Sequence, residues 1–300
     1  MKHFSVLILL LLRVIATQAL PAYIRTFGDP AAQPVVFLHG GPGYNCAGFE
    51  GGAAGRLAGS GFYVLVYDRS GEGRSVCKDA PYTFEAALQE LDEVCTAYNL
   101  AQPILIGHDF GGMLGILYTD RYPHKVKKLV LISTATDLQD NFRNIIARSR
   151  TLYMARHDTT NLRYIAELDR LDTAGIQYSV YCLIHALQNG FYTPTANARP
   201  LPDSLFGYVL KMEYEAPAGY WRNEQYTILN LDAPLKRIAR KKNKVYGMYG
   251  KNDNQFSVAQ VNHLKQIAGS RHILYLEHCA HSVFLDQTDA FVLAIKNWDQ

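Results

Sequence analysis

Residues 104–112 read ILIGHDFGG, and this stretch decides the fold. The run from Ile104 to Ile106 indicates a short buried strand, and the residues from Met113 to Tyr122 have the spacing of a helix. Between the two, small residues flank Asp109, as a sharp strand–turn–helix bend requires. Such a bend exposes the side chain at its apex, near the positive end of the helix that follows. A simple turn with Asp109 as the helix N-cap is the alternative interpretation.

Short apolar runs also alternate with helical stretches on both sides of residues 104–112. Short apolar runs follow a predicted edge strand at 23–27, and they alternate with helical stretches such as 84–98. The apolar runs lie at 35–38, 62–67, 130–132, 244–249 and 272–276, and a last helix is predicted at 286–298. Continuous apolar strands that alternate with helices predict an α/β fold, with a mostly parallel sheet covered on both faces.

Predicted strands are absent between residues 137 and 232. This segment reads as helical and is rich in tyrosine, with several proline and glycine breaks. We therefore predict that 20–136 and 233–300 form one α/β core and that 137–232 form an inserted helical cap. The tyrosines of this segment are Tyr153, Tyr164, Tyr178, Tyr181, Tyr192, Tyr208, Tyr214, Tyr220 and Tyr226.

Composition excludes several function classes. The chain has 300 residues, 19% of them charged, and a formal net charge of +3, so no nucleic-acid partner is predicted. The basic run at 237–244 is interpreted as a solvated helix end. The 5 cysteines show no metal spacing, so we predict no metal site and no cofactor.

Residues 1–19 form a candidate leader. The apolar run at 4–12 is too short to span a bilayer, and 17–19 offers a small-residue cleavage site. We predict a signal peptide, an exported protein (periplasmic or secreted) and no stable membrane insertion. Arg13 interrupts the segment, and an N-terminal strand in a cytoplasmic protein is the alternative.

Three further loops carry polar residues where a predicted strand ends. HGGPG at 39–43 follows one strand, GKND at 250–253 places Asp253 after another, and EHCAHS at 277–282 places His281 after a third. Open α/β sheets form their sites at the carboxyl ends of their strands. The order of elbow, acid and histidine therefore predicts an active site that these loops share with Asp109.

These motifs resemble those of the α/β-hydrolase superfamily over essentially the whole chain after the leader. The stretches that carry the resemblance are HGGPG at 39–43, YDRSGEGRS at 67–75, GHDFGG at 107–112, GKND at 250–253 and HCAHSVFLDQ at 278–287. HGGPG resembles the proline iminopeptidase branch, whereas GHDFGG resembles the epoxide hydrolase and dehalogenase branch. The apex position that holds Ser in many relatives holds Asp109 here.

The resemblance implies a role for each landmark. A carboxylate is already anionic at neutral pH, so Asp109 needs no activation to attack a strained sp³ carbon. His281 would then activate the water that hydrolyses the resulting ester, while Asp253 orients His281. The backbone N–H groups of Gly41 and Phe110 would form the oxyanion hole.

The expected reaction is the opening of an epoxide, and the substrate is a small molecule. Epoxide relatives protonate the ring oxygen with cap tyrosines, and position along the chain favours Tyr153 and Tyr220, with Tyr226 in reserve for the second. The alternative is a proline iminopeptidase-like peptidase or an esterase, in which Glu224 would bind a substrate amine. A third hypothesis is an inactive, ligand-binding homologue. The haloalkane branch has Trp after the nucleophile, and its side-chain N–H binds halide. The side chain of Phe110 has no such donor, which argues against a dehalogenase.

Other candidates compete for single roles. His278 is a neighbour of His281, but the family's histidine loop fits His281 better. Asp137 is a fallback for the acid, because it follows the strand at 130–132. His108 is expected to be a structural hydrogen-bonding residue, and Cys279 a small buried side chain.

Overall fold

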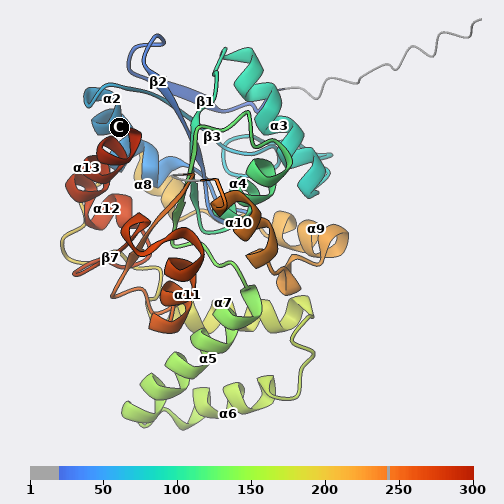
Figure 1. The fold of residues 1–300 in the computed structure, drawn as a ribbon. Helices are drawn as coiled ribbons and strands as arrows, with labels where there is room; N and C mark the ends of the chain where they lie inside the picture. The colour runs from blue at the N-terminus through green and yellow to red at the C-terminus, as the bar shows by residue number, and fades with distance from the viewer. Residues whose placement is uncertain (1–19, 242–243) are drawn as a thin grey trace, which may run out of the picture.

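The computed structural model describes residues 20–241 and 244–300, so the predicted leader at 1–19 lies outside the described residues. The strands form one sheet with the order β1-β3-β2-β4-β5-β6-β7 (Figure 1). Their bounds are β1 Ile24–Phe27, β2 Gln33–Leu38, β3 Phe62–Tyr67, β4 Ile104–His108, β5 Lys128–Ile132, β6 Val245–Gly250 and β7 Ile273–Leu276.

The predicted sheet type is confirmed. β1 lies at the edge and runs antiparallel to β3, with Ile24 opposite Tyr67. Every other pair of neighbouring strands is parallel. The strand of the elbow, β4, lies in the middle, where it pairs with β2 on one side and β5 on the other. The strand order reverses around β4, which is the usual place for a site in an open α/β sheet.

Two apolar cores, one on each face of the sheet, explain why the strands are apolar along their whole length. All six residues of β3 are buried, for example. Val36 and Leu65 belong to a core that includes Leu114 of α4, whereas Val35 and Val64 belong to a core that includes Phe291 of α13. Side chains alternate between the faces of a strand, so both alternating sets must be apolar when both faces are covered.

Helices of several lengths connect the strands and cover the sheet (Figure 1). Within the described ranges, none of them is both long and apolar enough to cross a membrane. Their bounds are α1 Ala47–Phe49, η1 Glu50–Ala54, α2 Gly55–Gly59, α3 Phe84–Ala97, α4 Phe110–Arg121, α5 Leu138–Ala155, α6 Thr159–Leu168, α7 Ile176–Gln188, α8 Asp203–Val209, α9 Glu215–Glu224, η2 Tyr226–Ile228, α10 Asp232–Ala239, α11 Val258–Ala268, η3 Ser270–His272, α12 Val283–Asp286 and α13 Thr288–Asp299.

The chain between β5 and β6 contains α5 to α9 and η2 before it returns to the sheet through α10. In Figure 1, α5, α6 and α7 extend away from the sheet at the bottom of the view. α5 packs against both α6 and α7. The limits predicted for the cap, 137 and 232, stay a prediction, although the helical character of the segment agrees with it.

The last helix agrees with the prediction of a final helix at about 286–298, because α13 spans Thr288–Asp299. The structure has α12 and α13, which are separated at Gln287, where the backbone leaves the helical region with φ −132°. The carboxylate of Asp286 accepts hydrogen bonds from the backbone N–H groups of Ala280 and Thr195 at 2.7 Å each. Asp286, the last residue of α12, therefore holds the loop that contains His281.

Candidate active site

Asp109 lies at the apex of a strained turn between β4 and α4. Its backbone angles are φ 50° and ψ −119°, which a residue with a side chain seldom adopts. The glycines around it are required by close packing. A Cβ on Gly111 would lie 2.1 Å from the carbonyl oxygen of Leu38, and one on Gly107 would lie 2.4 Å from Cα of Gly112. The strain, of the order of 1–3 kcal/mol, is typical of a functional residue held in place by its surroundings.

The carboxylate of Asp109 contacts the two backbone N–H groups predicted as the oxyanion hole. The N–H of Gly41 donates to Oδ2 at 3.3 Å, and the N–H of Phe110, next in the chain, helps to lower the pKa of the carboxylate. The side chain is partly exposed. Burial raises the pKa of Asp109, while the positive charge of His281 and the two N–H groups oppose that rise. One carboxylate oxygen therefore occupies the hole, at the N-terminus of α4.

His281 and Asp253 form a buried pair beside Asp109. Nδ1 of His281 lies 3.0 Å from Oδ2 of Asp253, and the two residues are 3% and 2% exposed. Burial disfavours the charged imidazolium, but the carboxylates of Asp253 and Asp109 outweigh it and raise the pKa of His281. The structure thus brings Asp109, His281 and Asp253 together, and their catalytic roles stay a prediction.

The competing histidines have other surroundings. His278 is exposed, and its backbone has φ 51°. His108 is buried with its ring 4.7 Å from that of His281, and its Nε2 lies 3.3 Å from the carbonyl oxygen of His281. Burial keeps the pKa of His108 well below its ordinary value, so this ring is neutral. Its contact with the backbone of His281 agrees with the structural part expected of it.

A buried ion pair holds the HGGPG loop at 39–43, and sequence reasoning assigned it no part. Arg69 donates to the carbonyl oxygens of His39 and Gly40 at 2.7 and 2.8 Å. Its partner Glu72, 2.8 Å away, accepts the backbone N–H of Gly43 at 2.6 Å. The loop is therefore fixed on both sides of Gly41. The signal was present in the stretch YDRSGEGRS, which was used only as a landmark of the superfamily.

The tyrosines predicted for the site have neighbours other than Asp109. The hydroxyl of Tyr153 lies 3.0 Å from both Nδ1 of His185 and Oε1 of Gln188, on α7. Tyr220 packs edge-on against the ring of Phe110 at 5.0 Å, and burial and the charge of Glu72 raise its pKa. Position along the chain alone could not show which cap side chains turn toward the elbow.

Two other tyrosines are coupled to Asp109. Burial raises the pKa of Tyr192 and of Tyr226, and the charge of Asp109 adds to the rise in both. The ring of Tyr192 packs edge-on against His281 at 5.0 Å, and that of Tyr226 packs against Phe110 at 5.7 Å. Across residues 20–241 and 244–300, neither hydroxyl has a protein hydrogen-bond partner. Tyr226 was the reserve candidate, whereas Tyr192 was not selected from the sequence.

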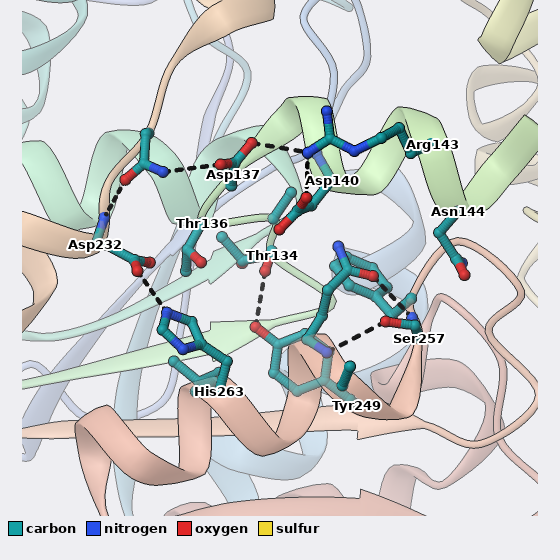
Figure 2. A pocket seen from close by; sticks show the side chains of 16 residues that line it. Thr134, Thr136, Asp137, Asp140, Arg143, Asn144, Asp232, Tyr249, Ser257 and His263 are labelled. Carbon is teal, nitrogen blue, oxygen red and sulfur yellow. Dashed lines mark hydrogen bonds and ion pairs between the residues drawn. The ribbon is translucent and has the colours of Figure 1, made fainter.

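Two carboxylates considered for the site accept backbone N–H groups at the start of helices. Glu224 accepts the backbone N–H of Phe84 at 2.6 Å, at the start of α3. Asp137 caps α5 and bonds to Asn230, and it lines a cleft of about 520 Å³ between α5, α10 and α11 (Figure 2). The carboxylate against His281 is thus Asp253 and not Asp137. In the described part of the chain, no group of His, Cys, Asp and Glu is arranged to hold a metal ion.

Comparisons with known proteins agree with this architecture. Residues 33–166 match the family described as the alpha/beta hydrolase fold. VinJ has a similar structure, with a TM-score of 0.67 and 23% identity over 92% of this chain and 94% of that one. The proline iminopeptidase of Mycobacterium smegmatis gives a TM-score of 0.62 and 20% identity, over 92% and 93% of the chains. The fold of this chain is therefore the α/β-hydrolase fold.

Curated relatives are similar over part of their length. The proline iminopeptidase of Lactiplantibacillus plantarum is 38% identical over 117 residues, which are 37% of this chain and 40% of that relative. The match thus covers about two fifths of that relative. The proline iminopeptidase of Saccharolobus solfataricus is 26% identical over 294 residues, which are 88% of this chain and 84% of that relative.

Proposed function

We propose that this chain, which has the α/β-hydrolase fold, is a hydrolase that opens an epoxide through a covalent ester on Asp109. One observation carries the proposal: an oxygen of the Asp109 carboxylate already accepts the N–H of Gly41, with Phe110 beside it. In a serine hydrolase these N–H groups receive an oxygen of the substrate. When the nucleophile is a carboxylate, the oxyanion forms on the enzyme's own oxygen, so the N–H groups should hold that oxygen from the start.

The first step forms the ester. The free carboxylate oxygen of Asp109 attacks an epoxide carbon, the ring C–O bond breaks, and its electron pair goes to the ring oxygen. A hydroxyl of Tyr192 or Tyr226 gives that oxygen a proton. Because burial and Asp109 raise both tyrosine pKa values above the ordinary 10, both hydroxyls are protonated at neutral pH. We therefore assign ring-oxygen activation to Tyr192 and Tyr226 in place of Tyr153 and Tyr220.

The second step hydrolyses the ester. His281 takes a proton from a water molecule as the water attacks Cγ of Asp109, and the oxyanion on Oδ2 is stabilised by Gly41 and Phe110. Collapse of the tetrahedral intermediate breaks the bond between Cγ and the oxygen that attacked first. The departing alkoxide takes the proton from His281, and Asp109 is left as a carboxylic acid. Its proton returns to the tyrosinate formed in the first step, which leaves a diol, an ionised Asp109 and a protonated tyrosine. Asp253 stabilises the imidazolium during this step.

A second candidate is a proline iminopeptidase-like peptidase or an esterase, which the named relatives favour over an epoxide hydrolase. The intact HGGPG loop around Gly41 supports it. Two observations oppose it. A carboxylate that attacks an amide would have to form a high-energy anhydride, and Glu224, the residue considered for a substrate amine, already accepts the backbone N–H of Phe84. The third candidate is an inactive, ligand-binding homologue, which would have the same fold and would convert no substrate.

A single-turnover experiment in ¹⁸O-labelled water separates these candidates. With excess protein and styrene oxide, the diol should contain no ¹⁸O, because its new oxygen comes from Asp109, and the label should appear in the peptide that contains Asp109. His281→Gln should accumulate the adduct by intact mass, and Asp109→Ala should form none. Labelled diol would refute the ester. Cleavage of proline p-nitroanilide or p-nitrophenyl acetate without epoxide turnover would favour the second candidate, and no turnover of any of these substrates would favour the third.

A further inference from the structure

Nδ1 of His281 has two neighbours in the structure, and only one of them is the acid. The carboxylate Oδ2 of Asp253 lies 3.0 Å away, and the side-chain amide nitrogen Nε2 of Gln255 lies 2.8 Å away. Asp253, Gln255 and His281 are all at most 3% exposed, so water does not compete for these contacts. At this distance the amide of Gln255 and Nδ1 must be a matched donor and acceptor, because a buried polar group without a partner costs free energy.

The protonation of Nδ1 decides which end of the amide faces it. If Nδ1–H donates to Asp253, an amide N–H cannot also donate to Nδ1, so the amide of Gln255 must be turned by 180° and its oxygen must face the ring. The two ends of an amide have the same shape, and the hydrogen-bond network sets their orientation. If instead Gln255 donates to a bare Nδ1, then the carboxylate of Asp253 faces a lone pair, and the proton lies on Nε2. Such a ring could not accept a proton from water at Nε2.

We propose that Gln255 is a positioning residue, which accepts a second hydrogen bond from Nδ1–H of His281 and so keeps Nε2 free to act as a base. Its catalytic consequence rests on the proposed function, but its effect on the tautomer does not. In this arrangement Nδ1–H is shared between a carboxylate and an amide oxygen. Both acceptors stabilise the imidazolium, since a charged N–H is the stronger donor.

Several bonds hold Gln255 in this position. Its backbone N–H donates to Oδ1 of Asp253 at 3.1 Å. Its backbone carbonyl oxygen accepts a hydrogen bond from Nδ2 of Asn141 at 2.7 Å. The side chain of Asn144 donates a hydrogen bond to the backbone carbonyl oxygen of Asn254 at 3.0 Å. The two asparagines are three residues apart and so share one face of α5. The first helix of the inserted segment therefore fixes the loop that supplies both acceptors.

Other charged groups around His281 must be considered in a titration. The carboxylates of Asp109 on the elbow and Asp286 on α12 also raise its pKa. The neutral ring of His108 lies against it from β4, and the ring of Tyr192 lies against it from the inserted segment. None of these groups contacts Nδ1 as Gln255 does, so a change confined to Gln255 isolates the second acceptor.

The test is ¹⁵N NMR of the histidine rings in the free, full-length protein, with His281 assigned by its loss in His281→Gln. We expect a protonated Nδ1 and a bare Nε2 in the neutral ring. Gln255→Met, which has a similar shape and no amide, should lower the pKa of His281 by about one unit. Gln255→Glu should raise it. Gln266→Met, an exposed glutamine on α11 without contact to the site, should change nothing.

Two results would overturn the proposal. One is a neutral His281 with its proton on Nε2, and the other is a pKa in Gln255→Met equal to that of the unmodified protein. A failure of the epoxide reaction affects neither readout, because both are measured without substrate. If the reaction is observed, Gln255→Met should slow ester hydrolysis at neutral pH about tenfold and leave ester formation unchanged. A structural defect alone would slow both steps together.

Discussion

Replacement of Arg69 by lysine should uncouple the two steps of the proposed reaction. Arg69 lies 2% exposed and reaches three partners at once: the carbonyl oxygens of His39 and Gly40, and the carboxylate of Glu72. A lysine ammonium is a point charge without the planar fork of a guanidinium, so it cannot keep all of these bonds. Glu72 would retain a positive partner and the N–H of Gly43, and the loop would be loosened on one side only.

The cost in stability follows from burial. Breaking a buried ion pair costs about 3–5 kcal/mol when a charge is left alone. Because lysine keeps the charge, we expect roughly 2–3 kcal/mol, measured as a lower urea midpoint with an unchanged slope. The protein should remain folded, since both apolar cores are untouched.

The kinetic effect should be unequal between the steps. During attack, negative charge leaves Asp109, so the N–H of Gly41 is less needed than in the resting state. During hydrolysis, a full oxyanion forms on Oδ2, and one donor of such a hole is worth about 10²–10³ in rate. Because Phe110 remains, we expect hydrolysis to fall roughly 10–100-fold while ester formation changes little.

Rapid-quench intact mass against time measures both rates. With excess styrene oxide, Arg69→Lys should accumulate the ester to a higher steady level than the unmodified protein does. Lys251→Arg, on the exposed surface, is the matched control for exchange of the two cations. Equal slowing of both steps in a folded Arg69→Lys protein would refute the argument that the ion pair acts through the oxyanion hole.

Four further predictions follow from the same geometry. Ester hydrolysis should slow as the pH falls through a His281 pKa above the ordinary 6.5, because only the neutral ring accepts a proton, and the adduct should persist longer in quench experiments at low pH. Tyr192→Phe and Tyr226→Phe should each slow ester formation about 10–100-fold, whereas Tyr153→Phe should not, by the same mass assay. Asp109→Asn should form no ester, and since it removes a partly buried carboxylate whose pKa is raised, it should increase Tm by roughly 2–4 °C. Gly111→Ala should lower the free energy of unfolding by about 3 kcal/mol or more, or prevent folding, because its Cβ would lie 2.1 Å from the carbonyl oxygen of Leu38.

The sequence predicted the frame of the site well, because that frame depends on local signals. An apolar strand, a glycine-flanked apex and a helix must follow one another to place Asp109, and all three are contiguous in the chain. Asp253 and His281 follow strands of the same parallel sheet, so the edge of the sheet brings them together whatever the loop lengths are. The structure places all three where these signals put them.

The cap tyrosines depend on contacts that no local pattern encodes. Tyr153 and Tyr192 are 39 positions apart in the inserted segment, Tyr153 in a helix and Tyr192 in the turn after α7, and neither has a neighbouring motif that marks it as part of a site. What separates them is the packing of α7: His185 and Gln188 bind the hydroxyl of Tyr153, whereas Tyr192, just after that helix, reaches His281. The sequence could not predict the contact of Gln255 with His281 either, because nothing marks Gln255 in the sequence except its position two residues after Asp253.

The apparent conflict between HGGPG and GHDFGG has a physical resolution in this arrangement. HGGPG supplies a backbone N–H at Gly41, and that group has no preference for whose oxygen it receives. GHDFGG supplies the oxygen that lies there, because the carboxylate of Asp109 is long enough for Oδ2 to lie 3.3 Å from the N–H of Gly41. A substrate carbonyl would have to displace an anion from the hole, at a cost that its own neutral oxygen cannot recover. An acyl-transfer site and a carbon-alkylating site can thus share one loop, and the chemistry changes with a single side chain.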